Sequence, residues 1–110
     1  MLYMSFEDFC RQAKQLPRLS REEEKECAQR MALGDSAARQ QLIDSYLPQV
    51  AGCLQRLDPT LKTLRTVYAA IATLEKGVDS FNFQQDAEKF SHHLSWRLRQ
   101  CVTRCIAERY

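Results

Sequence analysis

The C-terminal segment, residues 86–110, places the strongest constraint on the fold, because its apolar side chains recur every three or four positions. This spacing puts them on one side of an amphipathic helix, and that side is expected to face a hydrophobic core. The residues concerned are Phe90, Leu94, Leu98, Cys101, Val102 and Cys105. The rest of the chain therefore has to supply the elements that cover this side.

The opposite side of the same predicted helix carries a mixed set of aromatic, cationic, amide and hydroxyl groups. These residues are His92, Trp96, Arg99, Gln100 and Thr103, with His93, Arg97 and Arg104 at the flanks. An aromatic ring offers bases a stacking surface, guanidinium groups attract phosphates, and amides or hydroxyls hydrogen-bond to base edges. This combination favours nucleic-acid binding. The competing interpretation is an ordinary solvated helix surface with one half-buried tryptophan.

Composition favours an all-α fold, a compact bundle of four to five helices in a single domain spanning residues 1–110. The chain has only three Gly and three Pro in 110 residues, and its frequent Ala, Leu, Gln, Glu and Arg are good helix formers. An N-terminal helix within residues 1–16 is expected to precede the other helices in residues 17–110. No apolar run approaches the roughly 20 residues of a membrane span, and no signal-peptide pattern is present, so a cytoplasmic location is expected.

Local charge is more informative than the formal net charge of +2. Between residues 89 and 110, five cationic side chains accompany one acid, Glu108. This excess suits a surface that faces phosphates, although basic residues near a helix C-terminus also complement the helix dipole.

No catalytic or metal-binding motif competes with this interpretation, so the chain is expected neither to be an enzyme nor to hold a cofactor. Five cysteines lie mostly at apolar helical positions without a Cys-x-x-Cys pair, which favours reduced core thiols over a metal site or disulfides. His92 and His93 diverge by about 100° on a helix, a poor arrangement for one metal ion. The sequence also lacks a glycine-rich phosphate loop and a His-Glu-x-x-His pattern.

Local signals predict the first two helices. Ser5 is expected to cap a first helix that ends before Pro17, because the residue preceding a proline avoids helical geometry. Ser20 followed by Glu23 is a capping box, which predicts the start of a second helix running to Leu33.

A tight turn and an internal proline shape the next predicted helix. Gly34 can supply the left-handed residue that ends the second helix, and Asp35 or Ser36 can cap the third at once, so the two are expected to pack as a hairpin. Pro48 removes one backbone donor, and it is expected to bend or interrupt the third helix near residues 45–47.

The middle of the chain predicts one further helix. Asp58-Pro59 indicates a turn, and the regular apolar spacing over residues 61–81 predicts a fourth, mostly buried helix. Residues 82–85 are expected to form a short polar connection to the C-terminal helix.

Two stretches resemble the bacterial sigma-70 family of transcription factors. The promoter-reading helix of that family carries Lys-Phe-Ser, two tryptophans, Arg-Gln, Thr-Arg and Ala-Ile-Ala. The corresponding residues here are Phe90-Ser91, Trp96, Arg99-Gln100, Thr103-Arg104 and Ile106-Ala107-Glu108. The segment that precedes the core-binding helices of primary sigma factors is similar to Leu16-Pro17, Leu19-Ser20, Glu22-Glu23-Glu24, Ala28, Arg30, Gly34-Asp35, Ala38-Arg39 and Leu42-Ile43-Asp44. The matches occur in the family's order and cover residues 16–110.

The resemblance implies the fold of sigma factor domain 2 and a partner, the minus-ten element of promoter DNA. The DNA-binding residues that it implies are Trp96, Arg97, Arg99, Gln100, Thr103 and Arg104. Gln100 and Thr103 would read the upstream base pair of the element, with Arg99 and Arg104 on its phosphates, and these side chains suit such roles. Arg97 stands where the family has its second tryptophan.

RNA polymerase core is the second partner that the resemblance implies, and here the chain departs from the family. Where related factors carry Asp-Leu-Ile-Gln-Glu-Gly-Asn, this chain has Arg65-Thr66-Val67-Tyr68-Ala69-Ala70-Ile71. Reversing one charge at an interface opposes the original docking. The working hypothesis is a divergent sigma-like transcription initiation protein. The alternative is a sigma-fold interaction module that docks on a protein through Arg65 and Tyr68, and a third interpretation is a segment of a longer factor.

Overall fold

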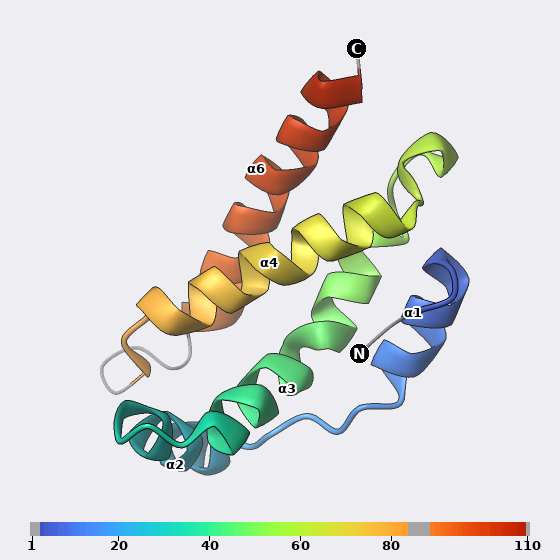
Figure 1. The fold of residues 1–110 in the computed structure, drawn as a ribbon. Coiled ribbons are helices and arrows are strands. Elements are labelled where there is room, and N and C mark those ends of the chain that lie inside the picture. The colour runs from blue at the N-terminus through green and yellow to red at the C-terminus, as the bar shows by residue number, and fades with distance from the viewer. Residues whose placement is uncertain (1–2, 84–88, 110) are drawn as a thin grey trace.

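The computed structural model describes residues 3–83 and 89–109, and every regular element in this part of the chain is a helix (Figure 1). The elements are α1 (Phe6–Lys14), α2 (Arg21–Ala32), α3 (Ser36–Leu54), the short 3-10 helix η1 (Pro59–Leu61), α4 (Leu64–Ser80) and α6 (Phe90–Arg109). The all-α prediction is confirmed. The predicted C-terminal helix is confirmed over Phe90–Arg109, and residues 86–88 and 110 lie outside the described part.

The predicted capping residues start the first two helices. Ser5 Oγ accepts the backbone N–H of Asp8 at 3.1 Å. Ser20 and Glu23 form the reciprocal capping box: Ser20 Oγ accepts the Glu23 N–H at 3.2 Å, and Glu23 Oε1 accepts the Ser20 N–H at 2.9 Å. Hydrogen bonding to Ser20 lowers the pKa of Glu23, because it favours the charged carboxylate. The backbone N–H of Ser20 has the larger effect and its hydroxyl the smaller.

The turn between α2 and α3 forms as the sequence predicts. Gly34 has a φ of 95°, a left-handed conformation that L side chains rarely adopt. Asp35, rather than Ser36, caps α3, because its carboxylate accepts the backbone N–H groups of Ala37 and Ala38 at 3.0 and 3.1 Å. The two helices pack against each other as a hairpin (Figure 1).

Helix α3 lies at the centre of the fold and packs against α1, α2, α4 and α6. Its side chains Leu42, Val50 and Leu54 are completely buried. Pro48 lies inside this helix, which is continuous, so of the two predicted effects the interruption is wrong and the bend stays a prediction. Buried residues precede and follow the proline, and their packing against one shared core outweighs the loss of a single backbone hydrogen bond.

A cluster of aromatic rings anchors the start of α6. The completely buried Phe90 ring lies 4.7 Å from Tyr46, 5.1 Å from Phe81 and 4.8 Å from Phe83, measured between ring centroids. The predicted polar connection over residues 82–85 is therefore wrong at Phe83, which is 2% exposed. The reason is that its ring completes the cluster around Phe90. Residues 84 and 85 lie outside the described part.

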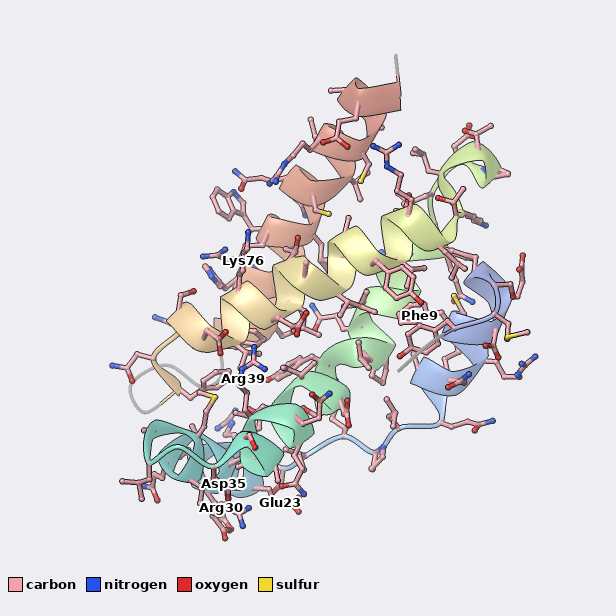
Figure 2. The ribbon with its side chains drawn as sticks, in the orientation of Figure 1. Phe9, Glu23, Arg30, Asp35, Arg39 and Lys76 are labelled. Carbon is pink, nitrogen blue, oxygen red and sulfur yellow. The ribbon has the colours of Figure 1, made fainter. Side chains whose placement is uncertain are left out.

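An ion pair joins α3 to the end of α4. Arg39 donates from Nε and a terminal nitrogen to the two carboxylate oxygens of Asp79, at 2.7 and 2.9 Å. Figure 2 shows Arg39 reaching from α3 toward α4. The Arg39 guanidinium lowers the pKa of Asp79 by hydrogen bonding to its carboxylate. Because both side chains are partly exposed, the pair contributes only about 0–1 kcal/mol and mainly fixes the relative position of the helices.

Candidate nucleic-acid interface

One side of α6 is exposed to solvent along most of its length. Trp96 is 56% exposed, which is unusual for so large an apolar ring. The other exposed residues on this side are His92, Arg99, Gln100, Thr103 and Arg104. On the opposite side Phe90, Leu94 and Leu98 are buried. The structure thus brings five of the six predicted DNA-binding residues together on one accessible surface, and it leaves Arg97 half-buried at the edge.

A side chain from α3 sets the rotation of α6 about its axis. Gln49 donates to the Ser91 carbonyl oxygen at 2.8 Å and to Ser95 Oγ at 3.0 Å, and its amide oxygen accepts the Ser91 hydroxyl at 2.7 Å. Three hydrogen bonds therefore hold the first turns of the helix against α3. Gln49 could not be identified from the sequence, since nothing local connects a glutamine to serines 42 and 46 positions away.

Arg97 is held within the molecule rather than extended into solvent. Its Nε donates to Nε2 of His93 at 2.8 Å, and a terminal nitrogen donates to Ser80 Oγ at 3.4 Å. Burial and, secondarily, the Arg97 charge lower the pKa of His93, which favours the neutral imidazole that can accept this hydrogen bond. A guanidinium has five N–H donors, so Arg97 retains donors for a ligand.

Thr103 and Gln100 differ in how many of their hydrogen-bonding groups are available to contact a base. The Thr103 hydroxyl donates to the Arg99 carbonyl oxygen of its own helix at 2.9 Å. Its oxygen can still accept a hydrogen bond from a base, whereas donating to one requires the hydroxyl to rotate away from the helix. Gln100 is exposed, and its amide carries both donors and an acceptor. Gln100 is therefore the better placed of the two for direct base reading.

A shallow groove of about 220 Å³ runs beside this surface, between α4 and α6. From α6 it is lined by Arg97, Gln100 and Arg104, and from α4 by Lys76. Figure 2 shows Lys76 extending from α4 toward α6. Lys76 could not be identified from the sequence, because a lysine on the polar side of an amphipathic helix looks like any solvated surface residue.

The two predicted partner-binding residues on α4 face different neighbours. Arg65 forms a long ion pair with Glu108 of α6, at 3.4 Å, and its side chain is 81% exposed. The Tyr68 hydroxyl accepts the backbone N–H of Tyr3 at 3.2 Å, and its side chain is 39% exposed. Val67, on the other side of α4, is buried in the core. Arg65 and Tyr68 are three positions apart, so they lie next to each other on the same exposed side of α4.

All five cysteines are free thiols, and burial raises the pKa of Cys53 and Cys105. Among the described residues, no three His, Cys, Asp or Glu side chains gather in a way that could hold a metal ion. In the same residues no helix combines the length and apolar character needed to cross a membrane.

Curated relatives match the chain over most of its length. An RNA polymerase sigma factor SigA from Clostridium acetobutylicum is 33% identical over 101 residues, which cover 91% of this chain and 26% of the relative. An RNA polymerase sigma factor SigA from Bacillus sp is 29% identical over 101 residues, with the same two coverages of 91% and 26%. The chain spans about a quarter of the length of these relatives. No family model matches it, and no solved structure does.

Proposed function

Because the chain is a distant relative of the bacterial sigma-70 factors, we propose that it is a sigma-like transcription initiation protein that binds the minus-ten element of promoter DNA. RNA polymerase core is the proposed protein partner. One observation carries the proposal: an exposed tryptophan, an amide, a hydroxyl and two guanidiniums share one side of α6. These residues are Trp96, Gln100, Thr103, Arg99 and Arg104.

Each group on this surface has a role that suits unpaired or opening promoter DNA. The Trp96 ring can stack on a base, a contact worth about 1–3 kcal/mol. Gln100 can pair with the two hydrogen-bonding positions on the major-groove edge of adenine. Arg99 and Arg104 supply charge for phosphates, which favours binding without selecting sequence. With a single tryptophan, the surface is suited to bind the element more than to open the duplex.

Removing both the stacking ring and a phosphate contact tests the proposal. We expect the double variant Trp96→Ala, Arg99→Ala to bind a fluorescent single-stranded minus-ten oligonucleotide with a Kd raised about 10- to 100-fold. The double substitution Arg56→Ala, Lys25→Ala, at exposed positions outside α6, is the control and should change the Kd much less. Fluorescence anisotropy with single-stranded and duplex oligonucleotides gives both values. Equal, negligible binding by the wild type and the double variant would contradict the proposed binding of minus-ten DNA.

A second candidate function is docking on a protein through α4. The observation that favours it is the 81% exposed Arg65 side chain at a place where related factors have an acidic residue. Recovery of RNA polymerase on the immobilised chain, lost on Tyr68→Glu and kept on Tyr68→Phe, would support docking at this helix. The Tyr68→Phe control matters because either substitution removes the hydroxyl that accepts the Tyr3 N–H. Recovery that is indifferent to Tyr68→Glu counts against this surface.

A further inference from the structure

Arg97 of α6 lies against α4, and three contacts hold it there. Its Nε donates to Nε2 of His93 at 2.8 Å, and a terminal nitrogen donates to Ser80 Oγ at 3.4 Å. The Ser80 hydroxyl donates its own proton to the Lys76 carbonyl oxygen, which leaves its oxygen free to accept. A Cβ placed on Gly77 would lie 3.7 Å from Arg97 Cδ, so the aliphatic part of Arg97 covers this glycine. The guanidinium is therefore kept at the edge of the exposed side of α6.

The hydrogen bond from Arg97 requires one protonation state of His93. A guanidinium only donates hydrogen bonds, so Nε2 of His93 has to present a lone pair and the ring proton has to reside on Nδ1. Two aromatic rings hold the imidazole in this position, since its centroid lies 5.4 Å from that of Phe81 and 6.3 Å from that of Phe90. The contact between Arg97 and His93 therefore exists only while His93 is neutral.

The charges around His93 also favour its neutral form. Burial is the larger cause of its lowered pKa, and the positive charge of Arg97 is the second. The described acids in the last turns of α4 act on Arg39 of α3, and the other described residues that α3, α4 and α6 bring to this region are cationic or neutral. The acids are Glu75 and Asp79, and the others are Lys76, Gln49 and Lys89. A proton on Nε2 would therefore meet the guanidinium without a described carboxylate to balance it.

Arg97 lies in line with two residues of the proposed DNA-binding surface. Residues three or four positions apart are neighbours on one side of a helix, so Arg97, Gln100 and Arg104 follow one another along α6. All three line the groove beside that surface. A guanidinium released into this line can bind a phosphate with two parallel N–H groups.

We propose that His93 is a positioning residue for Arg97: the neutral imidazole holds Arg97 against α4, and the protonated imidazole releases it to the DNA-binding side of α6. This inference rests on the proposed binding of minus-ten DNA and adds a pH dependence to it. At neutral pH the surface has Arg99 and Arg104 for phosphates. As the pH falls below the ordinary histidine value of about 6.5, Arg97 joins them and the affinity for DNA rises.

Nuclear magnetic resonance of the free protein tests the contact without DNA. At about pH 7.5 we expect His93 in the Nδ1–H tautomer and an Arg97 Nε–H signal that exchanges slowly with water, and both features should disappear as His93 titrates toward about pH 5. His93→Phe keeps a ring beside Phe81 and Phe90 but has no acceptor, so its Arg97 signal should exchange rapidly at every pH. His92→Gln, at the neighbouring exposed histidine, should retain the slow signal. Rapid exchange of the Arg97 signal in the wild type at neutral pH would overturn the proposal.

The salt dependence of binding tests the consequence for DNA. Each phosphate contact steepens the slope of log Kd against log salt concentration by about 0.7 for a single strand. For a single-stranded minus-ten oligonucleotide, we expect His93→Phe to steepen the slope by about one contact at neutral pH, and the further substitution Arg97→Gln to abolish this gain. Lowering the pH to about 5 should steepen the slope of the wild type more than that of Arg97→Gln. Circular dichroism establishes that each variant is folded.

Two results with DNA would contradict the role of His93. One is an unchanged slope in His93→Phe although its Arg97 signal exchanges rapidly, and the other is a gain that survives Arg97→Gln. The Arg97 signal is measured without DNA, so failure of minus-ten binding and failure of the contact with His93 are distinguished.

Discussion

Phe90→Ala should lower the free energy of unfolding by about 3–5 kcal/mol, the largest loss that we expect from any single substitution. Phe90 is completely buried, and its ring contacts Tyr46, Phe81 and Phe83. Truncation would remove the apolar area of the ring, leave a cavity and break three ring contacts at once. Since domains of this size are stable by only about 5–15 kcal/mol, the variant should be close to unfolding at physiological temperature.

Urea denaturation followed by circular dichroism measures this effect. Ile106→Ala is the matched control, because Ile106 lies on the same helix and is 41% exposed. Its effect should stay below about 1 kcal/mol, as is usual for surface positions. A loss of less than 1 kcal/mol for Phe90→Ala would show that the ring cluster does not anchor α6.

Tyr46→Phe should destabilise the fold by about 1.5–3 kcal/mol, although it removes a single oxygen atom. The Tyr46 hydroxyl donates to Glu24 Oε1, and both side chains are buried. Burial and, secondarily, this hydrogen bond raise the pKa of Tyr46 far above its ordinary value. The substitution keeps the ring packed on Phe90 but leaves the Glu24 carboxylate without this donor in an environment where water cannot easily replace it.

A double-mutant cycle with Glu24→Met isolates the contribution of this pair. Replacing both partners with apolar groups removes the unsatisfied carboxylate, so the double variant should be more stable than the sum of the single effects predicts. Chemical denaturation of the four proteins gives the coupling free energy. Additive effects would mean that the hydroxyl and the carboxylate do not depend on each other.

The helix boundaries could be predicted from the sequence because they depend on near neighbours in the chain. Ser5, Ser20 and Gly34 act within four residues of their own positions, and such local preferences survive folding unchanged. Pro48 shows the limit of this reasoning. Its local effect favours an interruption, but the core on both sides keeps α3 continuous.

Contacts between distant parts of the chain could not be predicted in the same way. Gln49 reaches residues more than 40 positions away, and Phe83 becomes buried because the rings of Phe81 and Phe90 pack against it. The sequence around Gln49 does not distinguish it from any other polar helix residue, and the sequence around Phe83 does not distinguish it from an exposed residue of a connection. Helical periodicity specifies which side of a helix is buried, but it does not specify the helix against which that side packs.

The candidate site was predictable in part for the same reason. The exposed side of α6 follows directly from the spacing of Phe90, Leu94 and Leu98. Arg97 lies at the edge of this side, in keeping with its predicted flanking position, but its contacts with His93 and Ser80 could not be predicted from the sequence. The groove beside this side of α6 forms because α4 packs next to α6. Lys76 of α4 could therefore be placed near the site only from the structure.

The central claim, that the exposed side of α6 binds the minus-ten element, is tested most directly by mapping amide chemical shifts while single-stranded minus-ten DNA is added. We predict that the largest changes fall on residues 96–104 and on the indole N–H of Trp96, and that a scrambled oligonucleotide produces smaller changes. The absence of changes in this segment, or changes confined to α1 and α2, would contradict the account.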